Sequence, residues 1–343
     1  MTGDYTKPRI RPVAERTPSA DARGRAHVVT VTRAKRRSAV LTPSGLACLS
    51  VLPTINLTAG CLHDCVYCYI RGYRNYPGES RVVLYEDTLE RLRHELRPGQ
   101  PKPRAVYFSP SSDLFQPAPE VLELSHAVLE FLFSQGIGVA FLTKGEIPDE
   151  TLELLIAHAD LVQAQIGLIT LDEEIARVFE PRAASPQTRL WQLHSLVAGG
   201  VAAAARLDPI LPTLTDDAEA LDRQFAALAQ VGVKRVAAGV LFLRSGISYW
   251  LSRRVPPEML APLLAAYREE EQAVMRGAEY PIQNLSAERR RGIFARLQEA
   301  AEVRGIHLDV CACKNSDIAR GSCNIAGTWP LRTPRAAQPV LMS

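Results

Sequence analysis

Short strand patterns alternate with helical patterns over most of the chain, and this alternation constrains the fold more than any other feature of the sequence. Strands of apolar and β-branched residues are predicted at 51–57, 104–109, 137–143, 161–167, 202–210 and 234–242. Helices with apolar residues at three- and four-residue spacing are predicted at 86–97, 118–135, 148–158, 172–179, 186–198 and 216–230. Because such alternation favours a parallel sheet, we predict an α/β fold, a partial (β/α)6 TIM-like barrel.

The alternation of strands and helices ends near residue 250. We predict that the chain has three parts. A basic, partly flexible N-terminal segment covers 1–45, and the barrel covers 46–250, with its ordered body starting near Val51. A helical extension with a cysteine-bearing C-terminal tail covers 251–343. In this last part, helices are predicted at 257–276 and 287–303 and a strand at 307–311.

The composition is typical of a soluble globular protein, with 47% apolar residues, 22% charged residues and a mean hydropathy of −0.04. The start of the chain contains no apolar signal-peptide region. No later stretch approaches the ~20 apolar residues of a membrane-spanning helix. We therefore predict a cytoplasmic protein with no membrane partner.

Positive charge is concentrated near the N-terminus. Residues 1–37 hold ten Lys or Arg and three acidic residues, a net charge of +7, whereas the whole chain carries +3. The run RAKRR at 33–37 suits either a solvated tail or an arm that follows nucleic-acid phosphates.

Six of the seven cysteines form two groups of three, and Cys48 stands apart. In a chain with no export signal, cysteines are typical of metal sites or redox chemistry rather than of structural disulfides. The sequence therefore predicts two metal sites, one at Cys61, Cys65 and Cys68 and one at Cys311, Cys313 and Cys323.

The first group has the spacing CxxxCxxC and directly follows the first predicted strand, with Gly60 supplying a sharp turn. Three thiolates at this spacing bind three irons of a 4Fe–4S cluster and leave the fourth iron open for a cofactor. A zinc site completed by His63 or by a distant cysteine is the alternative.

This pattern resembles the signature of the radical S-adenosylmethionine (SAM) superfamily, and segments over about residues 35–245 resemble its spore photoproduct lyase branch. The similar segments are RAKRRSAVL, NLTAGCLHDCVYCY, Ser109–Asp113, Thr143-Lys144, Glu180-Pro181, Arg189 and Arg206–Ile210. The resemblance implies an enzyme that reductively cleaves SAM at the 4Fe–4S cluster and generates a 5′-deoxyadenosyl radical. It also implies SAM and the 4Fe–4S cluster as cofactors.

The resemblance assigns roles to individual residues. Ser112 and Asp113 are expected to bind the cofactor's amino group and Lys144 its carboxylate, pairings that the charges of these side chains support. Arg206 is a further cofactor-binding candidate. Read from the residues alone, Asp113 could instead cap the next helix, Lys144 could be a solvated loop residue, and Arg206 could form a structural ion pair with Asp208.

Tyr67 and Tyr69 are the candidate catalytic residues, because the resemblance implies tyrosines that relay a hydrogen atom. Packing against the cluster is the alternative for either ring. The sequence departs from the lyase at Pro110, which stands where the lyase has a hydrogen-donating cysteine. Proline has no donor, so the lyase's own repair route is not expected here.

The second cysteine group has no counterpart in that resemblance. Cys311, Cys313 and Cys323 are predicted to hold an auxiliary iron–sulfur cluster, completed by Cys48, by a nitrogen or oxygen ligand, or by substrate. A zinc site and a metal-free redox thiol pair are the alternatives.

We expect an adenosyl-radical enzyme with a flavodoxin or ferredoxin as electron donor. Repair of a DNA lesion is the leading prediction for its substrate, and modification of a natural product or peptide is the second. A metal-binding regulatory or nucleic-acid-binding module without turnover is the alternative from another class.

Overall fold

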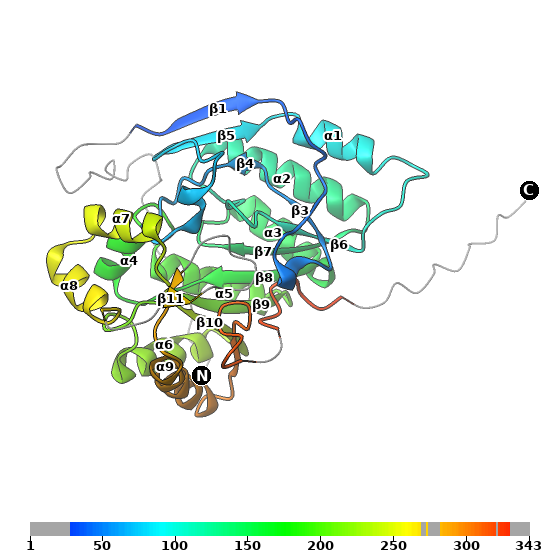
Figure 1. Ribbon diagram of the computed structural model, residues 1–343. Coiled ribbons are helices and arrows are strands. Elements are labelled where there is room, and N and C mark those ends of the chain that lie inside the picture. The colour runs from blue at the N-terminus through cyan, green and yellow to red at the C-terminus, as the bar shows by residue number, and fades with distance from the viewer. Residues whose placement is uncertain (1–27, 269–271, 274–281, 320–321, 330–343) are drawn as a thin grey trace, which may run out of the picture.

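The computed structural model describes residues 28–268, 272–273, 282–319 and 322–329. Within them, the main sheet has eight strands in the order β13-β10-β9-β8-β7-β6-β3-β2. Every neighbouring pair from β3 to β13 is parallel, and β2 is an antiparallel edge strand. Because the parallel strands follow chain order with helices between them, the sheet is a partial TIM-like barrel, as the sequence predicted (Figure 1).

The six predicted barrel strands and the six predicted helices are all present. The strands are β3 (Pro53–Ile55), β6 (Ala105–Phe108), β7 (Gly138–Thr143), β8 (Val162–Gly167), β9 (Ala202–Ile210) and β10 (Arg235–Val240). The helices are α1 (Thr88–Glu95), α2 (Pro119–Ser134), α3 (Asp149–Ala157), α4 (Glu173–Phe179), α5 (Pro186–Ala198) and α6 (Ala218–Gln230).

Strand β6 shows how the two faces of the sheet are used. Val106 and Phe108 belong to the main apolar core together with residues of α2 such as Leu132. Ala105 and Tyr107, which alternate with them, pack instead in a separate inner cluster. Alternate residues of the strand therefore face the helices outside and the interior of the barrel.

The C-terminal part continues the barrel. After β10 come α7 (Ser245–Arg254), which was not predicted, and α8 (Pro257–Ala265), which ends well before residue 276. Residues 269–271 and 274–276 of that predicted helix lie outside the described residues. Further along are β11 (Gln272–Ala273), β12 (Ile282–Gln283), α9 (Ala287–Glu302) and β13 (His307–Val310). Strand β13 pairs in parallel with β10, so it adds a seventh parallel strand.

Strand β1 (Thr30–Ala34) begins well before Val51, where the ordered body was predicted to start. It pairs in parallel with β5 (Arg81–Tyr85), and β5 pairs with β4 (Thr58–Ala59), which together form a small second sheet. Next in the chain, the Arg36 amide donates to Asp87 Oδ1 at 2.9 Å, and its guanidinium lies over the Tyr85 ring. Pairing between strands thus orders this basic segment from residue 28, whereas residues 1–27 lie outside the described part.

The remaining short elements are β2 (Thr42–Pro43) and the 3-10 helices η2 (Ala47–Leu49), η3 (Tyr69–Gly72) and η4 (Ala159–Leu161). None of the helices in the described residues is long and apolar enough to cross a membrane.

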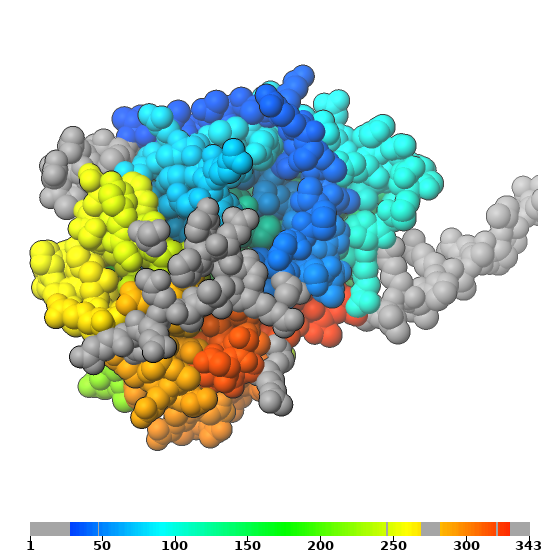
Figure 2. All heavy atoms as spheres, viewed as in Figure 1, coloured from blue at the N-terminus to red at the C-terminus, as the bar shows by residue number. Residues whose placement is uncertain are grey.

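The segment 322–329, here called the tail segment, packs against inner-facing residues of β7 and β8. The Trp329 ring lies against Gly138, and the Gln163 amide donates to the Thr328 carbonyl at 3.2 Å. Ala326 shares an apolar cluster with Leu49 of η2. In Figure 2 the tail segment, in red, accordingly lies beside the blue segment near residue 50.

Candidate active site

The first cysteine group lies on a loop that runs from β4 to η3, and its backbone is tied to neighbouring elements. Gly60 opens the loop with a φ of +84°, and a Cβ there would lie 2.8 Å from the Arg81 carbonyl oxygen. The Leu62 amide donates to Gln116 Oε1 at 2.7 Å, and the Val66 amide donates to the Phe179 carbonyl at 3.0 Å. The loop is therefore held between the segment after β6 and the end of α4.

Arg71 holds the second half of this loop. Its guanidinium donates to the Cys65 carbonyl at 3.2 Å and to the backbone and side-chain oxygens of Asp64 at 2.9 and 2.7 Å. It also lies 4.5 Å from the centre of the Trp250 ring on α7. Helix α7, absent from the sequence prediction, thus helps to position the cysteine loop.

The thiols of Cys61, Cys65 and Cys68 are free and interact with one another. Burial raises the pKa of all three, and for Cys61 the charges of Asp113, Cys65 and Cys68 raise it further. Thiolates in such a place require a compensating cation, which iron supplies. This donor set therefore fits an iron–sulfur cluster.

Across the described residues, no three His, Cys, Asp or Glu side chains are arranged to hold a single metal ion. A 4Fe–4S cluster places each thiolate on a different iron, so its ligands do not meet at one point. His63, the zinc ligand in the alternative interpretation, points elsewhere: its Nε2 lies 3.1 Å from Asp113 Oδ2, and its Nδ1 lies 3.4 Å from the Arg182 carbonyl.

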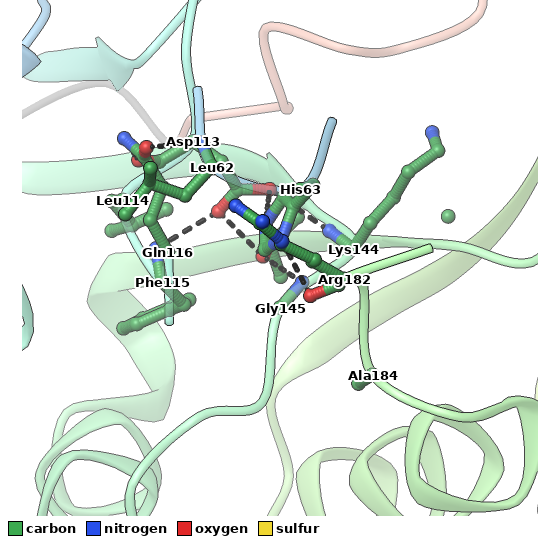
Figure 3. A network of polar contacts seen from close by, with 12 residues as sticks. Leu62, His63, Asp113, Leu114, Phe115, Gln116, Lys144, Gly145, Arg182 and Ala184 are labelled. Carbon is green, nitrogen blue, oxygen red and sulfur yellow. Dashed lines mark hydrogen bonds and ion pairs between the residues drawn. The ribbon is translucent and has the colours of Figure 1, made fainter. Parts of the chain in front are cut away.

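Asp113 is buried at the centre of a polar network (Figure 3). Its Oδ1 accepts from the Phe115 amide at 2.8 Å and from the Thr143 hydroxyl at 2.7 Å, while Oδ2 accepts from the Lys144 amide at 2.9 Å. Burial acts to raise the pKa of Asp113, but His63 and these hydrogen bonds outweigh it and lower the pKa. Asp113 therefore joins the cysteine loop to the ends of β6 and β7, and it does not cap α2.

Two buried hydroxyls beside Asp113 have no hydrogen-bond partner among the described residues, namely Ser109 Oγ and Ser112 Oγ. Ser109 also adopts a left-handed backbone with a φ of +56°. A buried hydroxyl without a partner costs about 1–3 kcal/mol. A ligand with polar hydrogens, such as an ammonium group, would satisfy both.

Lys144 lies at the carboxyl end of β7, and its side chain extends away from Asp113 (Figure 3). Its Nζ lies 3.9 Å from Glu180 Oε1 and 6.0 Å from the centre of the Tyr67 ring. Its side chain is 13% exposed, so it is not a solvated loop residue.

Glu180 connects several residues of the site. Arg189 Nη2 lies 2.6 Å from its Oε2, and the Tyr67 hydroxyl donates to its Oε1. Burial acts to raise the pKa of Glu180, but the charges of Arg189 and Lys144 and the Tyr67 hydrogen bond lower it. Glu180 thus stays ionised and keeps both cations near the cysteine loop.

The two candidate tyrosines are buried and have different partners. The Tyr67 hydroxyl contacts Glu180, as above, and the Tyr69 hydroxyl donates to the Pro110 carbonyl at 2.5 Å. Pro110, which lacks the lyase's thiol, therefore contributes only its backbone oxygen to this contact.

Arg206 lies inside β9, facing the barrel interior, and it does form the ion pair with Asp208, at 2.9 Å. It also donates to Gln165 Oε1 at 3.2 Å and contacts Cys323 Sγ at 3.5 Å. Arg206 as a cofactor ligand stays a prediction.

The second cysteine group is brought together by β13 and the tail segment. Cys311 and Cys323 are buried in one cluster and their thiols interact, and Cys313 packs beside them. The contacts with Cys311 and Arg206 lower the pKa of Cys323 to about 6, against the opposing effect of burial.

A family model described as the Radical SAM superfamily matches residues 55–225, about half of the chain. The matched region contains the cysteine loop and the barrel strands from β3 to β9.

The chain belongs to the radical SAM superfamily.

Membership implies a radical SAM enzyme with a 4Fe–4S cluster and SAM as cofactors. Among curated relatives, the radical SAM chain is 29% identical over 244 residues to a Mycobacterium tuberculosis protein, Rv2578c, covering 68% of this chain and 72% of the relative. It is 27% identical over 192 residues to a radical SAM Nα-GlyT isomerase of Pseudomonas phage M6, covering 55% of this chain and 38% of the isomerase.

Among solved structures, the radical SAM chain resembles spore photoproduct lyase in fold. A variant of that lyase superposes with a TM-score of 0.63 at 16% identity, covering 82% of both chains. The lyase in complex with dinucleoside spore photoproduct gives a TM-score of 0.63 at 15% identity and the same coverage. At this identity the likeness establishes the fold.

Several residues of this radical SAM site had no role predicted from the residues themselves. They are Arg71 and Gln116 around the cysteine loop, and Glu180 with Arg189 beside Lys144. Glu180 and Arg189 were noted only as part of the resemblance, and His63 was considered only as a zinc ligand. Gln116 lies 54 positions from Leu62 and Glu180 lies 113 positions from Tyr67, so no local spacing pattern marks these contacts.

Proposed function

We propose that this radical SAM enzyme binds its 4Fe–4S cluster through Cys61, Cys65 and Cys68 and binds SAM beside Ser112 and Lys144. When bound, the cluster and SAM supply one-electron cleavage of a carbon–sulfur bond and a radical that abstracts hydrogen from substrate. The observation that carries the proposal is the set of three free, interacting thiols on a loop held by Asp64, Arg71 and Gln116.

The ammonium and carboxylate groups of SAM, both on its methionyl moiety, have complementary groups at the carboxyl ends of β6 and β7. Among the described residues, the hydroxyls of Ser109 and Ser112 have no hydrogen-bond partner and are able to accept hydrogen bonds from the SAM ammonium group. The Lys144 amide donates to Asp113, but its side chain extends away from Asp113 and supplies a cation for the carboxylate of SAM. Asp113 contributes negative charge nearby and positions both segments.

Tyr67 and Tyr69 are proposed to transfer hydrogen at this site. Burial raises the pKa of both phenols well above the usual value, so each keeps its hydrogen at neutral pH. The Tyr69 hydroxyl points at the Pro110 carbonyl, on the segment that carries Ser112. Tyr69 is therefore the better placed of the two to act beside the cofactor.

A nucleic-acid substrate, such as a DNA lesion, is the substrate class we propose. Two observations support it: the fold resembles a lyase solved with a dinucleoside photoproduct, and Arg36, in the basic run after β1, is held on the body of the enzyme by Asp87 and Tyr85. The lyase's own route is not proposed, because Pro110 offers no thiol hydrogen.

We further propose that Cys311, Cys313 and Cys323 bind a second iron–sulfur cluster and that a low-potential ferredoxin or flavodoxin is the electron donor. The support for the second cluster is the convergence of these three free cysteines in the barrel interior.

The decisive experiment is anaerobic reconstitution followed by dithionite reduction and addition of SAM. We expect 5′-deoxyadenosine from the wild-type enzyme and none from Cys65→Ala, with more product when ultraviolet-irradiated DNA is added than with untreated DNA or a peptide mixture. An intact cluster that yields no 5′-deoxyadenosine would contradict the enzyme proposal. Equal yields with all three additions would contradict the nucleic-acid substrate alone.

A further inference from the structure

Four cysteines, rather than three, converge inside the barrel. Cys48, on η2, joins Cys311, Cys313 and Cys323, although more than 260 residues separate it from them. Cys311, Cys313 and Cys323 pack in one cluster, and Ile325 packs against both this cluster and the one that contains Cys48. The thiol of Cys48 interacts with those of Cys313 and Cys311, and the thiol of Cys311 interacts with that of Cys323. All four cysteines are free. The four thiols thus form one continuous group.

Separate parts of the fold hold this group together. The Cys311 amide donates to the Ala238 carbonyl of β10 at 3.0 Å, and the Gln165 amide of β8 donates to the Cys323 carbonyl at 3.1 Å. Apolar packing of Leu49 and Leu52 against Ala326 brings η2 onto the tail segment. The position of Cys48 therefore follows from packing that does not involve its own thiol.

The surroundings suit a negatively charged group. Arg206 Nη1 contacts Cys323 Sγ at 3.5 Å, and the Arg206 guanidinium also interacts with Cys311 and Cys48. Lys314 lies next to this group, with its Nζ 2.6 Å from Asp208 Oδ1. Four thiolates around iron carry net negative charge, which these two cations partly offset.

We infer that Cys48 is the fourth protein ligand of the second cluster, an inference that rests on the second cluster of the proposed function. Four thiolates give each iron of a 4Fe–4S cluster a protein ligand, so no iron is open to SAM or substrate. The second cluster is then an electron-transfer site. The second cluster accepts one electron from a ferredoxin, a flavodoxin or dithionite and passes that electron to the catalytic cluster. This transfer returns the second cluster to its oxidised state and leaves the catalytic cluster reduced.

The position of Tyr107 supports this electron path. Tyr107, on β6, faces the barrel interior and interacts electrostatically with Cys48 and Cys323 and also with Asp113 of the catalytic site. Tyr69 interacts with both Cys68 and Tyr107. Tyr107 and Tyr69 together therefore interact with residues of both the second cysteine group and the catalytic site.

The test uses the full chain with Cys61, Cys65 and Cys68 all changed to alanine, so that only the second site remains. After anaerobic reconstitution with iron and sulfide, we expect about four irons per chain and an electron paramagnetic resonance signal of a reduced 4Fe–4S cluster. Adding Cys48→Ala should at least halve the iron content, whereas Leu46→Ala, an exposed position beside η2, should leave it unchanged. Cys48→Ser should retain iron but shift the resonance, which keeps the test valid if the alanine variant fails to fold.

Three results would overturn the inference: iron content and spectrum unaffected by either Cys48 variant, binding of zinc in place of iron, or no metal at all. Each result is distinguishable from failure of the proposed function. SAM cleavage is measured separately, as 5′-deoxyadenosine formation by the chain with Cys61, Cys65 and Cys68 intact. A chain that cleaves SAM but binds no second cluster refutes the inference and leaves the proposed function standing.

Discussion

Single residues determine how the site is held, and Asp113 shows this best. It is buried, yet three hydrogen-bond donors and His63 contact its two oxygens. These contacts come from the cysteine loop, from the turn after β6 and from the end of β7. Replacing the carboxylate therefore loosens three segments together.

For Asp113→Asn we expect the free energy of unfolding of the iron-free protein at pH 7 to fall by about 2–4 kcal/mol. The pKa of Asp113 in the folded protein lies below its unfolded value of about 3.9. The contribution of the carboxylate to the free energy of unfolding is therefore complete above about pH 3.9 and is lost as the pH falls through the folded pKa. Urea unfolding at several pH values should thus show a difference from wild type that shrinks in acid. Glu130→Gln, at an exposed position on α2, is the control; a difference independent of pH would contradict this account.

Lys144 is the residue for which a binding role is most directly measurable. Lys144→Met should raise the dissociation constant of SAM on the reconstituted enzyme at least about tenfold, because the substitution removes the cation that pairs with the carboxylate of SAM. Lys102→Met is the matched control, since that lysine is exposed and donates to Gln135, away from the site. Titration calorimetry with SAM decides the point, and equal affinities for the two variants would refute the assignment.

Among the elements, the cysteine loop depends on its backbone as much as on its thiols. Gly60 has a positive φ and lies against both Pro77 and the Arg81 carbonyl, which leaves no room for a side chain. Its conformation fixes where Cys61 lies relative to β4.

Gly60→Ala should lower the iron bound per chain after reconstitution to well below that of wild type, because the added methyl overlaps backbone that must then move. Gly99→Ala offers a matched control: it has a φ of +86° but nothing within 4 Å of the added carbon. That variant should lose only about 1–2 kcal/mol of stability and retain its iron. Equal iron loss in both variants would contradict this account, because Gly99 lies between α1 and β6, outside the cysteine loop.

Across the whole molecule, two segments far apart in the chain, η2 and the tail segment, meet at the inner face of the barrel. The Trp329 ring lies against Gly138 of β7, and η2 packs on the tail segment. The tail segment therefore completes the inner face of the barrel as well as carrying Cys323.

Gly138→Ala should displace the Trp329 ring, since the new methyl would lie 2.3 Å from a ring carbon. We expect a red shift of tryptophan fluorescence and faster proteolysis near the C-terminus than in wild type. Gly292→Ala on α9, where the added carbon meets only the end of the Arg296 side chain at 4.0 Å, should change neither. An unshifted spectrum for Gly138→Ala would mean that the tail segment does not depend on this contact.

Local patterns in the sequence were enough to predict the barrel and the first cysteine group. Strand and helix periods are local properties, so β3, β6 to β10 and α1 to α6 were predictable from runs of about ten residues, whereas β4 and β5 were not predicted. The CxxxCxxC spacing is local for the same reason. Helix α7 was missed, and α8 was predicted too long because the chain turns after Ala265, soon after Pro262 within that helix.

Contacts between residues far apart in the chain followed from three-dimensional packing and were not predictable. The sequence placed Cys48 apart and left the fourth ligand of the second site open, yet packing of η2 on the tail segment brings Cys48 to Cys313. Likewise, Asp113 contacts His63 and Glu180 contacts Lys144 because the cysteine loop, β7 and α4 meet at one end of the barrel. Such contacts depend on how strands register and helices pack, which no local pattern of residues encodes.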